Sequence, residues 1–249
     1  LLWLPYVLAD YVRRTGKREI LYKTVSFIVS PMLKENENER YESAEKTREQ
    51  DTVLHHALLA ADMFISRGTG GHGLALMCAG DWNDGMNDVG ASGRGESVWL
   101  SWFGSVTLAA LGDLCEAEGE RERAARYRDF AERLKEAAEN AWDGEWYLRG
   151  YYDDGAKLGS KDSAECRIDS IAQSFAAFAG AHPARCGMAL SSAVNKLLDE
   201  ENRVVKLFTP PFSDGAEKPG YIKSYSAGFR ENGGQYTHAA VWLAIALIR

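Results

Sequence analysis

The sequence predicts a protein built almost entirely of α-helices, packed as two concentric layers. Helices that are apolar nearly all round alternate with amphipathic ones, and only one short segment shows the alternation of a strand. A helix that is apolar on every side must be buried, whereas an amphipathic helix covers it and faces water. We therefore expect an α/α barrel. The alternative is an α-solenoid of helix pairs, but the long loops are too unlike one another for simple repeats.

In the first quarter of the chain, helical spacing of apolar residues predicts helices over residues 1–14 and 51–67, the second with Asp51 as its N-cap. The short apolar stretch 19–29 fits either a helix or a strand. The segment 34–50 is rich in Glu, Asn, Lys and Arg, so we expect it to be a solvated loop.

A long glycine-rich loop over residues 68–95 comes next, and loops of such length are commonly functional. Ser97 is placed to cap an inner helix that ends at Ala117 and is apolar nearly all round. An amphipathic outer helix follows over about 120–141. The aromatic, alternating segment near 145–153 predicts a small β-hairpin.

The last third of the chain is predicted to hold helices over about 169–180 and 184–199, a loop rich in Pro and Gly over 201–235, and a final helix from Tyr236. No linker divides the sequence, so residues 1–249 read as one segment of a single domain. The chain begins without methionine and stops inside a predicted helix, so we expect it to be a piece of a longer polypeptide.

The composition excludes some partners. A net charge of −7 and a pI near 5.4, without clusters of Lys and Arg, argue against nucleic acid, which needs a basic surface. The four cysteines lie far apart and have no spacing typical of metal ligands, so we expect no metal site. The cysteines also suggest no disulfide framework, so we expect reduced thiols and a cytoplasmic setting. No apolar run is expected to reach the roughly 18–20 residues of a membrane span, and no cleavable leader is expected.

The most polar stretch of the chain is residues 80–88, GDWNDGMND, here called the acid loop. It holds three carboxylates, two amides and a tryptophan between glycines. An indole offers a stacking surface to the C–H face of a sugar, and carboxylates and amides bind its hydroxyl groups. Glycosidic bonds are broken by proton transfer from a carboxyl group. The acid loop therefore predicts a carbohydrate site.

Five separated blocks extend this interpretation and resemble glycoside hydrolase family 94, the inverting disaccharide and oligosaccharide phosphorylases. They lie at residues 72–100, 165–174, 207–212, 219–223 and 230–240. Within the family they are most similar to the branch that holds the C-terminal region of cyclic β-1,2-glucan synthases and the 1,2-β-oligoglucan phosphorylases. The resemblance implies an (α/α)6 barrel, incomplete here because the family's enzymes add further helices, a linker and an N-terminal β-sandwich.

The resemblance implies that Asp84 is the general acid. A glycosidic oxygen leaves only when protonated, and a carboxyl group beside an indole and away from bulk water can hold its proton near neutral pH. Trp82 and Asn83 are expected to bind the sugar. Asp81 has three open interpretations: it binds the sugar, it supports Asp84, or it forms a turn or helix cap.

The block at 231–238, ENGGQYTH, is the expected phosphate site. Glycines at 233 and 234 would let backbone N–H groups approach an anion, a helix start offers more of them, and His238 adds a donor. The resemblance implies that Gly233, Gly234 and His238 bind phosphate and that Glu231 binds the sugar. Because phosphate attacks the anomeric carbon itself, no second carboxylate is needed as a base.

A further polar cluster opens the helix near residue 169. Arg167, Asp169 and Gln173 resemble a sugar-binding block, although Asp169 is equally well placed as an N-cap and Arg167 as the partner of Glu165.

The predicted activity is inverting phosphorolysis of a β-linked, most plausibly β-1,2, oligoglucan to α-glucose 1-phosphate. No cofactor is expected, and inorganic phosphate is the co-substrate. One alternative is an inverting hydrolase with Glu231 or Asp169 as base. The other is a non-catalytic carbohydrate-binding segment. The expected partners are the glucan, phosphate and the remaining parts of the parent protein, which in a glucan synthase would place this segment on the cytoplasmic side of a membrane protein; a homodimer remains open.

Overall fold

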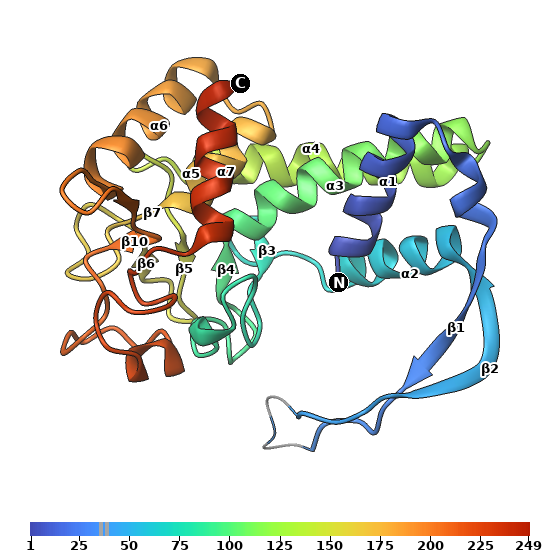
Figure 1. Ribbon diagram of the computed structural model, residues 1–249, viewed down its shortest axis with the longest axis horizontal. Helices are drawn as coiled ribbons and strands as arrows, with labels where there is room; N and C mark the ends of the chain where they lie inside the picture. Colours follow the sequence, from blue (N-terminus) through green and yellow to red (C-terminus); the bar gives the residue numbers. More distant parts are fainter. Residues whose placement is uncertain (35–36, 38–39) are drawn as a thin grey trace. The chain divides into compact units, whose positions relative to one another are not determined.

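The computed structural model describes residues 1–34, 37 and 40–249. It divides into two compact units. The first comprises Leu1–Arg67 with Thr107–Tyr127, and the second comprises Gly68–Val106 with Arg128–Arg249. Most of the regular structure is helical, so the predicted helical class is confirmed (Figure 1). That the whole chain forms one barrel segment stays a prediction.

The first unit contains α1 (Trp3–Thr15), a 3-10 turn (Arg18–Tyr22), the strands β1 (Thr24–Val29) and β2 (Glu45–Thr52), and α2 (Val53–Ser66). The helix α1 ends at Gly16, whose φ of 70° is a left-handed conformation that glycine adopts without strain. Thr52, not Asp51, caps α2, because its hydroxyl accepts the N–H of His55. The cap is one residue later than predicted because β2 continues through Asp51.

The strands β1 and β2 form an antiparallel hairpin in which Thr24 lies opposite Thr52 and Val29 opposite Glu45. The stretch left open as helix or strand is therefore a 3-10 turn followed by a strand. The prediction of a loop over residues 34–50 is wrong for 45–50, which belong to β2; residues 35, 36, 38 and 39 of that call lie outside the described part of the chain. A two-stranded ribbon that is exposed on both faces does not need alternating apolar residues. Its strands therefore cannot be recognised from the hydrophobic pattern of the sequence.

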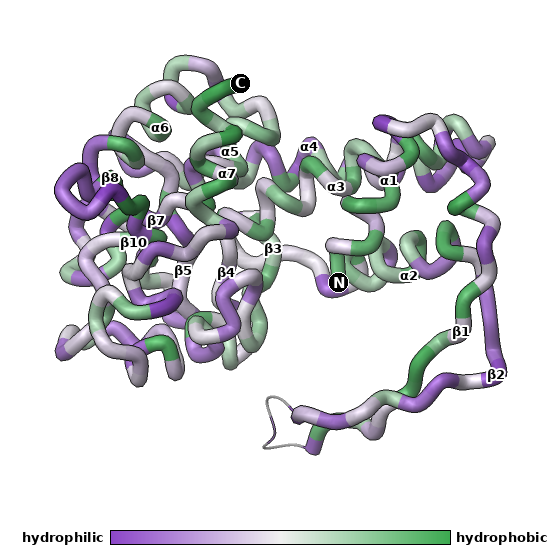
Figure 2. The backbone as a smooth tube through the Cα atoms, viewed as in Figure 1, coloured by the Kyte–Doolittle hydropathy of each residue, from purple (hydrophilic) through white to green (hydrophobic). Residues whose placement is uncertain are grey.

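The second unit holds α5 (Ser170–Phe178), α6 (Pro183–Leu197) and α7 (Thr237–Ile248). The helices α3 (Val98–Ala117) and α4 (Arg121–Asn140) each lie partly in this unit and partly in the other. Within the second unit, α5 and α7 run side by side and are hydrophobic along much of their length (Figure 2).

An aromatic cluster fills the core between these helices. Its ring centroids lie 5.2 Å apart for Trp99 and Phe103, and 4.8 Å apart for Phe175 and Trp242. The Trp99 and Trp242 rings are stacked, with centroids 6.2 Å apart. Aromatic pairs at such distances stabilise a core beyond the area that they bury. The cluster fixes the ends of α3, α5 and α7 that face the site described below.

Short strands join the loops of the second unit. A four-stranded antiparallel sheet has the order β3 (Ala75–Leu76), β4 (Glu96–Ser97), β5 (Gly150–Tyr151) and β6 (Lys157–Leu158). The remaining pairs are β7 (Ile168–Asp169) with β10 (Phe208–Thr209), and β8 (Leu198–Asp199) with β9 (Val204–Val205).

The hairpin predicted near 145–153 is shifted along the chain. It is formed by β5 and β6 around a turn at residues 153–155, and Tyr147 makes only an isolated bridge to Trp142. The alternating segment does contain a strand, but its position in the segment is set by pairing with a distant strand. β5 pairs with β4, which in turn pairs with β3, so the hairpin belongs to a larger sheet.

By length and composition α3 could cross a membrane, and it is the one helix of this kind in the part of the chain that the structure describes. The expectation that no apolar run reaches that length is therefore wrong. Some 72% of its most apolar window is buried inside the protein, as in a core helix.

Two glycines of the loop 68–95 give a matched test of its packing. A Cβ on Gly95 would lie 2.6 Å from the Cα of Gly90, and closer still to the carbonyl oxygen of Val89, whereas a Cβ on Gly71 meets nothing within 4 Å. Because backbone must shift, Gly95→Ala should lower the free energy of unfolding by about 1–3 kcal/mol. Gly71→Ala should change it by less than about 0.5 kcal/mol in chemical denaturation. Equal effects would contradict this packing.

Candidate active site

The acid loop is a compact turn whose tip carries Asp84. The side-chain oxygen of Asn83 accepts the N–H of Gly85 and so caps a 3-10 turn over Asp84–Met86. A Cβ on Gly85 would lie 2.9 Å from the Cβ of Ile222, so this residue must be small. Asp84 itself is exposed. The expectation that its carboxyl group is shielded from bulk water is therefore wrong for this chain, because the turn projects the side chain outward.

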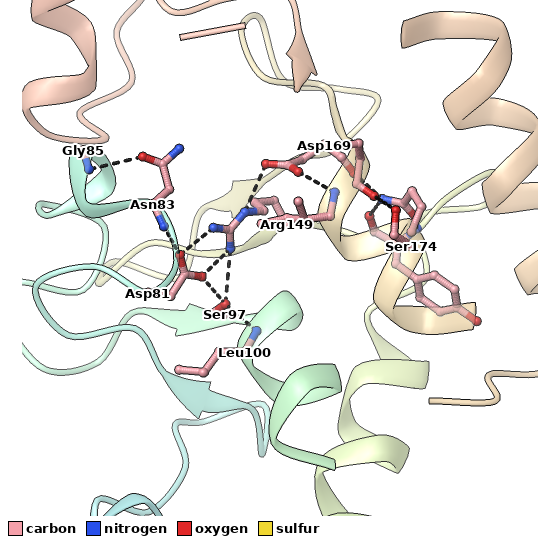
Figure 3. A network of polar contacts seen from close by, with 12 residues as sticks. Asp81, Asn83, Gly85, Ser97, Leu100, Arg149, Asp169 and Ser174 are labelled. Atoms are coloured by element: carbon pink, nitrogen blue, oxygen red, sulfur yellow. Dashed lines mark hydrogen bonds and ion pairs between the residues drawn. The ribbon is translucent and has the colours of Figure 1, made fainter. Parts of the chain in front are cut away.

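The base of the acid loop is fixed by a buried ion pair between Asp81 and Arg149. The two terminal nitrogens of the guanidinium donate to the two carboxylate oxygens, each at 2.7 Å, and both side chains are fully buried (Figure 3). The Ser97 hydroxyl donates to the same carboxylate at 2.6 Å. Bidentate hydrogen bonds of this kind fix both the distance between the two side chains and their relative orientation. Asp81 is thus the anchor of the loop that carries Asp84.

Arg149 also bonds a second buried carboxylate. Its Nε donates to Asp169 at 3.1 Å, and the other oxygen of Asp169 accepts the N–H of Ile171, which caps α5 (Figure 3). One cation therefore joins the acid loop to the start of α5.

The two carboxylates differ in their pKa values because they share this cation unequally. For Asp81, burial favours the protonated form, but the charge of Arg149 and the hydrogen bonds outweigh it, so the pKa is lowered. Asp169 receives only the Nε contact from Arg149, and burial raises its pKa to about 6. The charges of Asp81 and Asp169 oppose the burial of Arg149 and keep its guanidinium protonated.

The acid loop meets the glycine-histidine block across the start of α7. The indole N–H of Trp82 donates to Nδ1 of His238 at 3.2 Å. Because Nδ1 accepts, the proton of the neutral imidazole is placed on Nε2. Burial lowers the pKa of His238 and favours this neutral form. Two segments more than 150 residues apart are therefore in contact, as the sequence predicted, and that they form one catalytic site stays a prediction.

The phenol of Tyr236 is influenced by two carboxylates, those of Glu231 and Asp84. Its ring lies edge-on to Trp82, with centroids 5.1 Å apart. Burial raises the pKa of the Tyr236 phenol, and the negative charges of Glu231 and Asp84 raise it further, as does a hydrogen bond with Glu231. Asp84, Glu231 and the phenol therefore lie close together, beside the indole.

Comparison with known proteins decides the family. The sequence profile of the glycosyl hydrolase 94 superfamily, catalytic domain, matches residues 1–249. The chain belongs to this superfamily.

The chain is also similar to curated members of it. It is 46% identical to the cyclic β-(1,2)-glucan synthase NdvB of Rhizobium meliloti (strain 1021), over 98% of this chain and 9% of that protein. It is 33% identical to the 3-O-β-D-glucopyranosyl-β-D-glucuronide phosphorylase and 32% identical to the solabiose phosphorylase of Paenibacillus borealis, each over 98% of this chain and 29% of the relative. The glycosyl hydrolase 94 chain thus spans a small part of the length of these relatives.

The block at 165–174 of this glycosyl hydrolase 94 chain lies mainly in the interior. Gln173 is buried, and its amide bonds the backbone N–H and carbonyl groups of Tyr147. Asp169 is the cap and ion-pair partner described above. Arg167 is exposed, but its Nε donates to the carbonyl of Ser163. For Asp169 and Gln173 the structural interpretation is therefore favoured, because their polar atoms are buried and bonded. That they contact sugar stays a prediction.

The two glycines expected to bind phosphate lie in a tight turn of the backbone, and their contact with phosphate stays a prediction. The N–H of Gly233 donates to the carbonyl of Glu231, so it is not directed at an anion. Gly233 has a φ of 76°, and a Cβ there would lie 2.9 Å from that of Pro211. A Cβ on Gly234 would lie 2.8 Å from the carbonyl oxygen of Arg230. These glycines allow the tight turn that delivers Tyr236 and His238 to the site.

Sequence reasoning missed Arg149 and Tyr236. Arg149 lies just before β5 in a segment rich in aromatic residues, and a charged residue among residues that are usually buried is a signal that it has a partner of opposite charge. Among the described residues no group of three or more His, Cys, Asp or Glu side chains is placed to hold a metal ion.

The raised pKa of Asp169 predicts a specific pH dependence of stability. Between pH of about 4 and 6 the unfolded chain releases this proton first, so the folded state holds more protons and loses stability as the pH rises. A difference of about 2 pH units corresponds to about 3 kcal/mol. The free energy of unfolding of the unmodified chain, minus that of Asp169→Asn, should therefore fall by this order between pH of about 4 and 7. A difference that rises with pH would contradict the assignment.

Proposed function

We propose that this chain is the catalytic part of a β-glucan phosphorylase-like enzyme, which transfers a glucosyl unit from a β-linked, preferentially β-1,2-linked, oligoglucan to phosphate with inversion. The observation that carries the proposal is the hydrogen bond between Trp82 and His238, which joins the proton donor's loop to the start of α7. The relatives named as phosphorylases and as a glucan synthase support the substrate class.

In the proposed reaction, the carboxyl group of Asp84 gives its proton to the glycosidic oxygen while the bond from that oxygen to the anomeric carbon breaks. A phosphate oxygen attacks the same carbon from the opposite face and forms the new bond. The products are a shortened glucan and α-glucose 1-phosphate, and Asp84 regains a proton from the bound phosphate or from water. Asp81 and Arg149 hold the loop so that the carboxyl group keeps one position.

Phosphate would bind at the start of α7. The proton on Nε2 of His238 and the first N–H groups of this 12-residue helix supply donors, and the helix dipole favours an anion there. Tyr236 precedes the helix and makes no side-chain cap, so these N–H groups are not occupied from that position. His238 thus replaces the glycines as the centre of the proposed anion site.

The sugar would lie against the indole of Trp82 and the phenol of Tyr236. Glu231 is positioned to accept a hydroxyl hydrogen bond there. Its side chain is only 17% exposed, and Oε2 forms an ion pair with Nε of Arg230 at 3.3 Å but accepts no well-aligned hydrogen bond in the described chain. The buried Nδ2 of Asn83 also lacks one and is a donor for a sugar oxygen. For the hydrolase alternative, Glu231 is the better base, because Asp169 is buried against Arg149.

The proposal requires no cofactor beyond phosphate as co-substrate. Because the chain spans 9% and 29% of the relatives named above, we propose that the other parts of its parent protein complete the barrel and the site. A cytoplasmic location, on the cytoplasmic side of a membrane in a glucan synthase, and assembly as a homodimer belong to the same proposal.

The general-acid role predicts that Asp84→Asn abolishes phosphorolysis in the complete protein. Release of glucose 1-phosphate from β-1,2-oligoglucan should occur only with phosphate present, and the substitution should lower kcat by at least about 100-fold because proton transfer is lost. Asp88→Asn, in the same loop, is the matched control and should retain activity. Equal release of sugar without phosphate would instead favour hydrolysis.

The contact between Trp82 and His238 predicts an effect on phosphate. Trp82→Phe keeps an aromatic ring but removes the N–H that fixes the imidazole tautomer, so the KM for phosphate should rise about three- to tenfold, in line with the loss of one hydrogen bond. His238→Ala should raise it further. Initial rates at varied phosphate concentration measure both, and an unchanged KM in both variants would refute the anion site at His238.

A further inference from the structure

A second feature of the unit that holds the site is a groove outside it, with a volume of about 850 Å³. Its walls are formed by residues 152–164 on one side and 216–218 on the other. None of its lining residues belongs to the proposed catalytic set. The polar members used below are Tyr152, Lys157, Ser160, Glu217 and Lys218.

Both walls are held in place by buried carboxylates. On one side Asp143 accepts the Ser160 hydroxyl and the Lys161 N–H, each at 2.8 Å. On the other side Glu165 accepts the N–H groups of Ser213 and Gly215, at 2.7 and 3.0 Å. These hydrogen bonds are made within the chain itself. The walls of the groove are therefore held in place without a ligand, and binding does not have to order them.

Two buried polar atoms of the groove lack hydrogen-bond partners within the described ranges. They are the hydroxyl oxygen of Tyr152 and Oε2 of Glu217. Burial raises the pKa of Tyr152, and the charge of Glu217 raises it further, so the hydroxyl keeps its proton. A protonated phenol is a donor and a carboxylate is an acceptor, which are the two roles needed to bind sugar hydroxyl groups. Unpaired buried polar atoms are costly unless something else satisfies them.

The charges of the groove favour an uncharged occupant. Its cations are Lys157 and Lys218, and its anions are Asp154, Asp162 and Glu217. Lys157 is already within 3.2 Å of Asp143. A phosphate group would meet the three carboxylates, and a cationic ligand would meet the two lysines. A neutral polyhydroxylated chain avoids both and can stack on the ring of Tyr152.

The groove is continuous with the acid loop through the backbone. Asp153, next to Tyr152, accepts N–H groups of Ser92 and Gly95 at 2.7 and 2.9 Å. Pro219, next to Lys218, accepts the N–H of Asp88 at 3.2 Å. Each wall is thereby tied to the segment that carries the proposed acid.

We propose that this groove is a second carbohydrate-binding site, which holds an internal stretch of the β-glucan chain between Tyr152 and Glu217, away from the bond that reacts. The inference rests on the proposed function for the identity of the glucan. It assigns Tyr152 as hydrogen-bond donor and stacking surface, and Glu217 as acceptor. The site makes long chains better substrates than short ones.

The test compares long linear β-1,2-glucan with the shortest chain that the complete protein turns over. Tyr152→Phe removes only the hydroxyl, Tyr152→Ala also removes the ring, and Glu217→Gln replaces the carboxylate. Each should raise the KM for the long glucan about three- to tenfold and leave kcat and the KM for the short chain within about twofold. The matched controls Tyr41→Phe and Glu200→Gln, both at exposed positions, should change neither. Equal changes on both substrates, or no change on the long one, would overturn the proposal.

Binding of the long glucan can be measured even if the protein does not catalyse phosphorolysis. If the unmodified protein shows no phosphorolysis, calorimetric binding of the long glucan is measured on the same proteins. Weaker binding in Tyr152→Phe and Glu217→Gln, but not in the controls, supports the groove without the catalytic reaction. Unchanged binding in all variants, or binding of inorganic phosphate at the groove that is lost in Lys218→Ala, overturns the groove as a carbohydrate site.

Discussion

The site depends on one buried cation shared by two carboxylates. Arg149 fixes Asp81 through two parallel hydrogen bonds and Asp169 through a third, all away from solvent. Removing one member of such a cluster strands an uncompensated charge in the interior. For this reason the acid loop, β5 and the first turn of α5 cannot move independently. Asp84 lies three residues beyond Asp81, so the anchoring of Asp81 also restricts the position of Asp84.

Within the proposed site, some residues hold the structure in place and others face the space where a substrate would bind. Asp81 and Asp169 are buried and bonded, so they position others, while Asp84, Glu231 and His238 keep polar atoms directed to the surface of the site. Trp82 links the two groups, because its indole packs against Tyr236 and donates to His238. This division agrees with the proposal that an acidic stretch of nine residues supplies a single proton donor. It also agrees with the proposed anion site at the helix start.

Much of the fold could be predicted from the sequence, because long periodic helices and the cap at Ser97 are local signals. The hairpin of β1 and β2 could not, since its pairing leaves exposed polar side chains with no alternation to detect. For the site, the composition of the acid loop predicted carbohydrate binding, and the family resemblance implied the roles of Asp84 and His238. The burial of Asp81 and Gln173, the role of Arg149 and the internal bond of Gly233 depend on contacts between distant segments, which no local pattern encodes.

The claim that Arg149 and Asp81 act as one unit is tested most directly by a double-mutant cycle on the free energy of unfolding. Arg149→Met leaves the buried carboxylates of Asp81 and Asp169 without their cation, and Asp81→Ala leaves Arg149 with Asp169 alone. The double substitution removes both charges of the pair and leaves only Asp169, so the coupling energy isolates the contact between Arg149 and Asp81. The account predicts a coupling energy of about 2–3 kcal/mol, with the double variant more stable than the sum of the single effects implies. A coupling energy near zero would show that the acid loop is held by other contacts and would contradict the account.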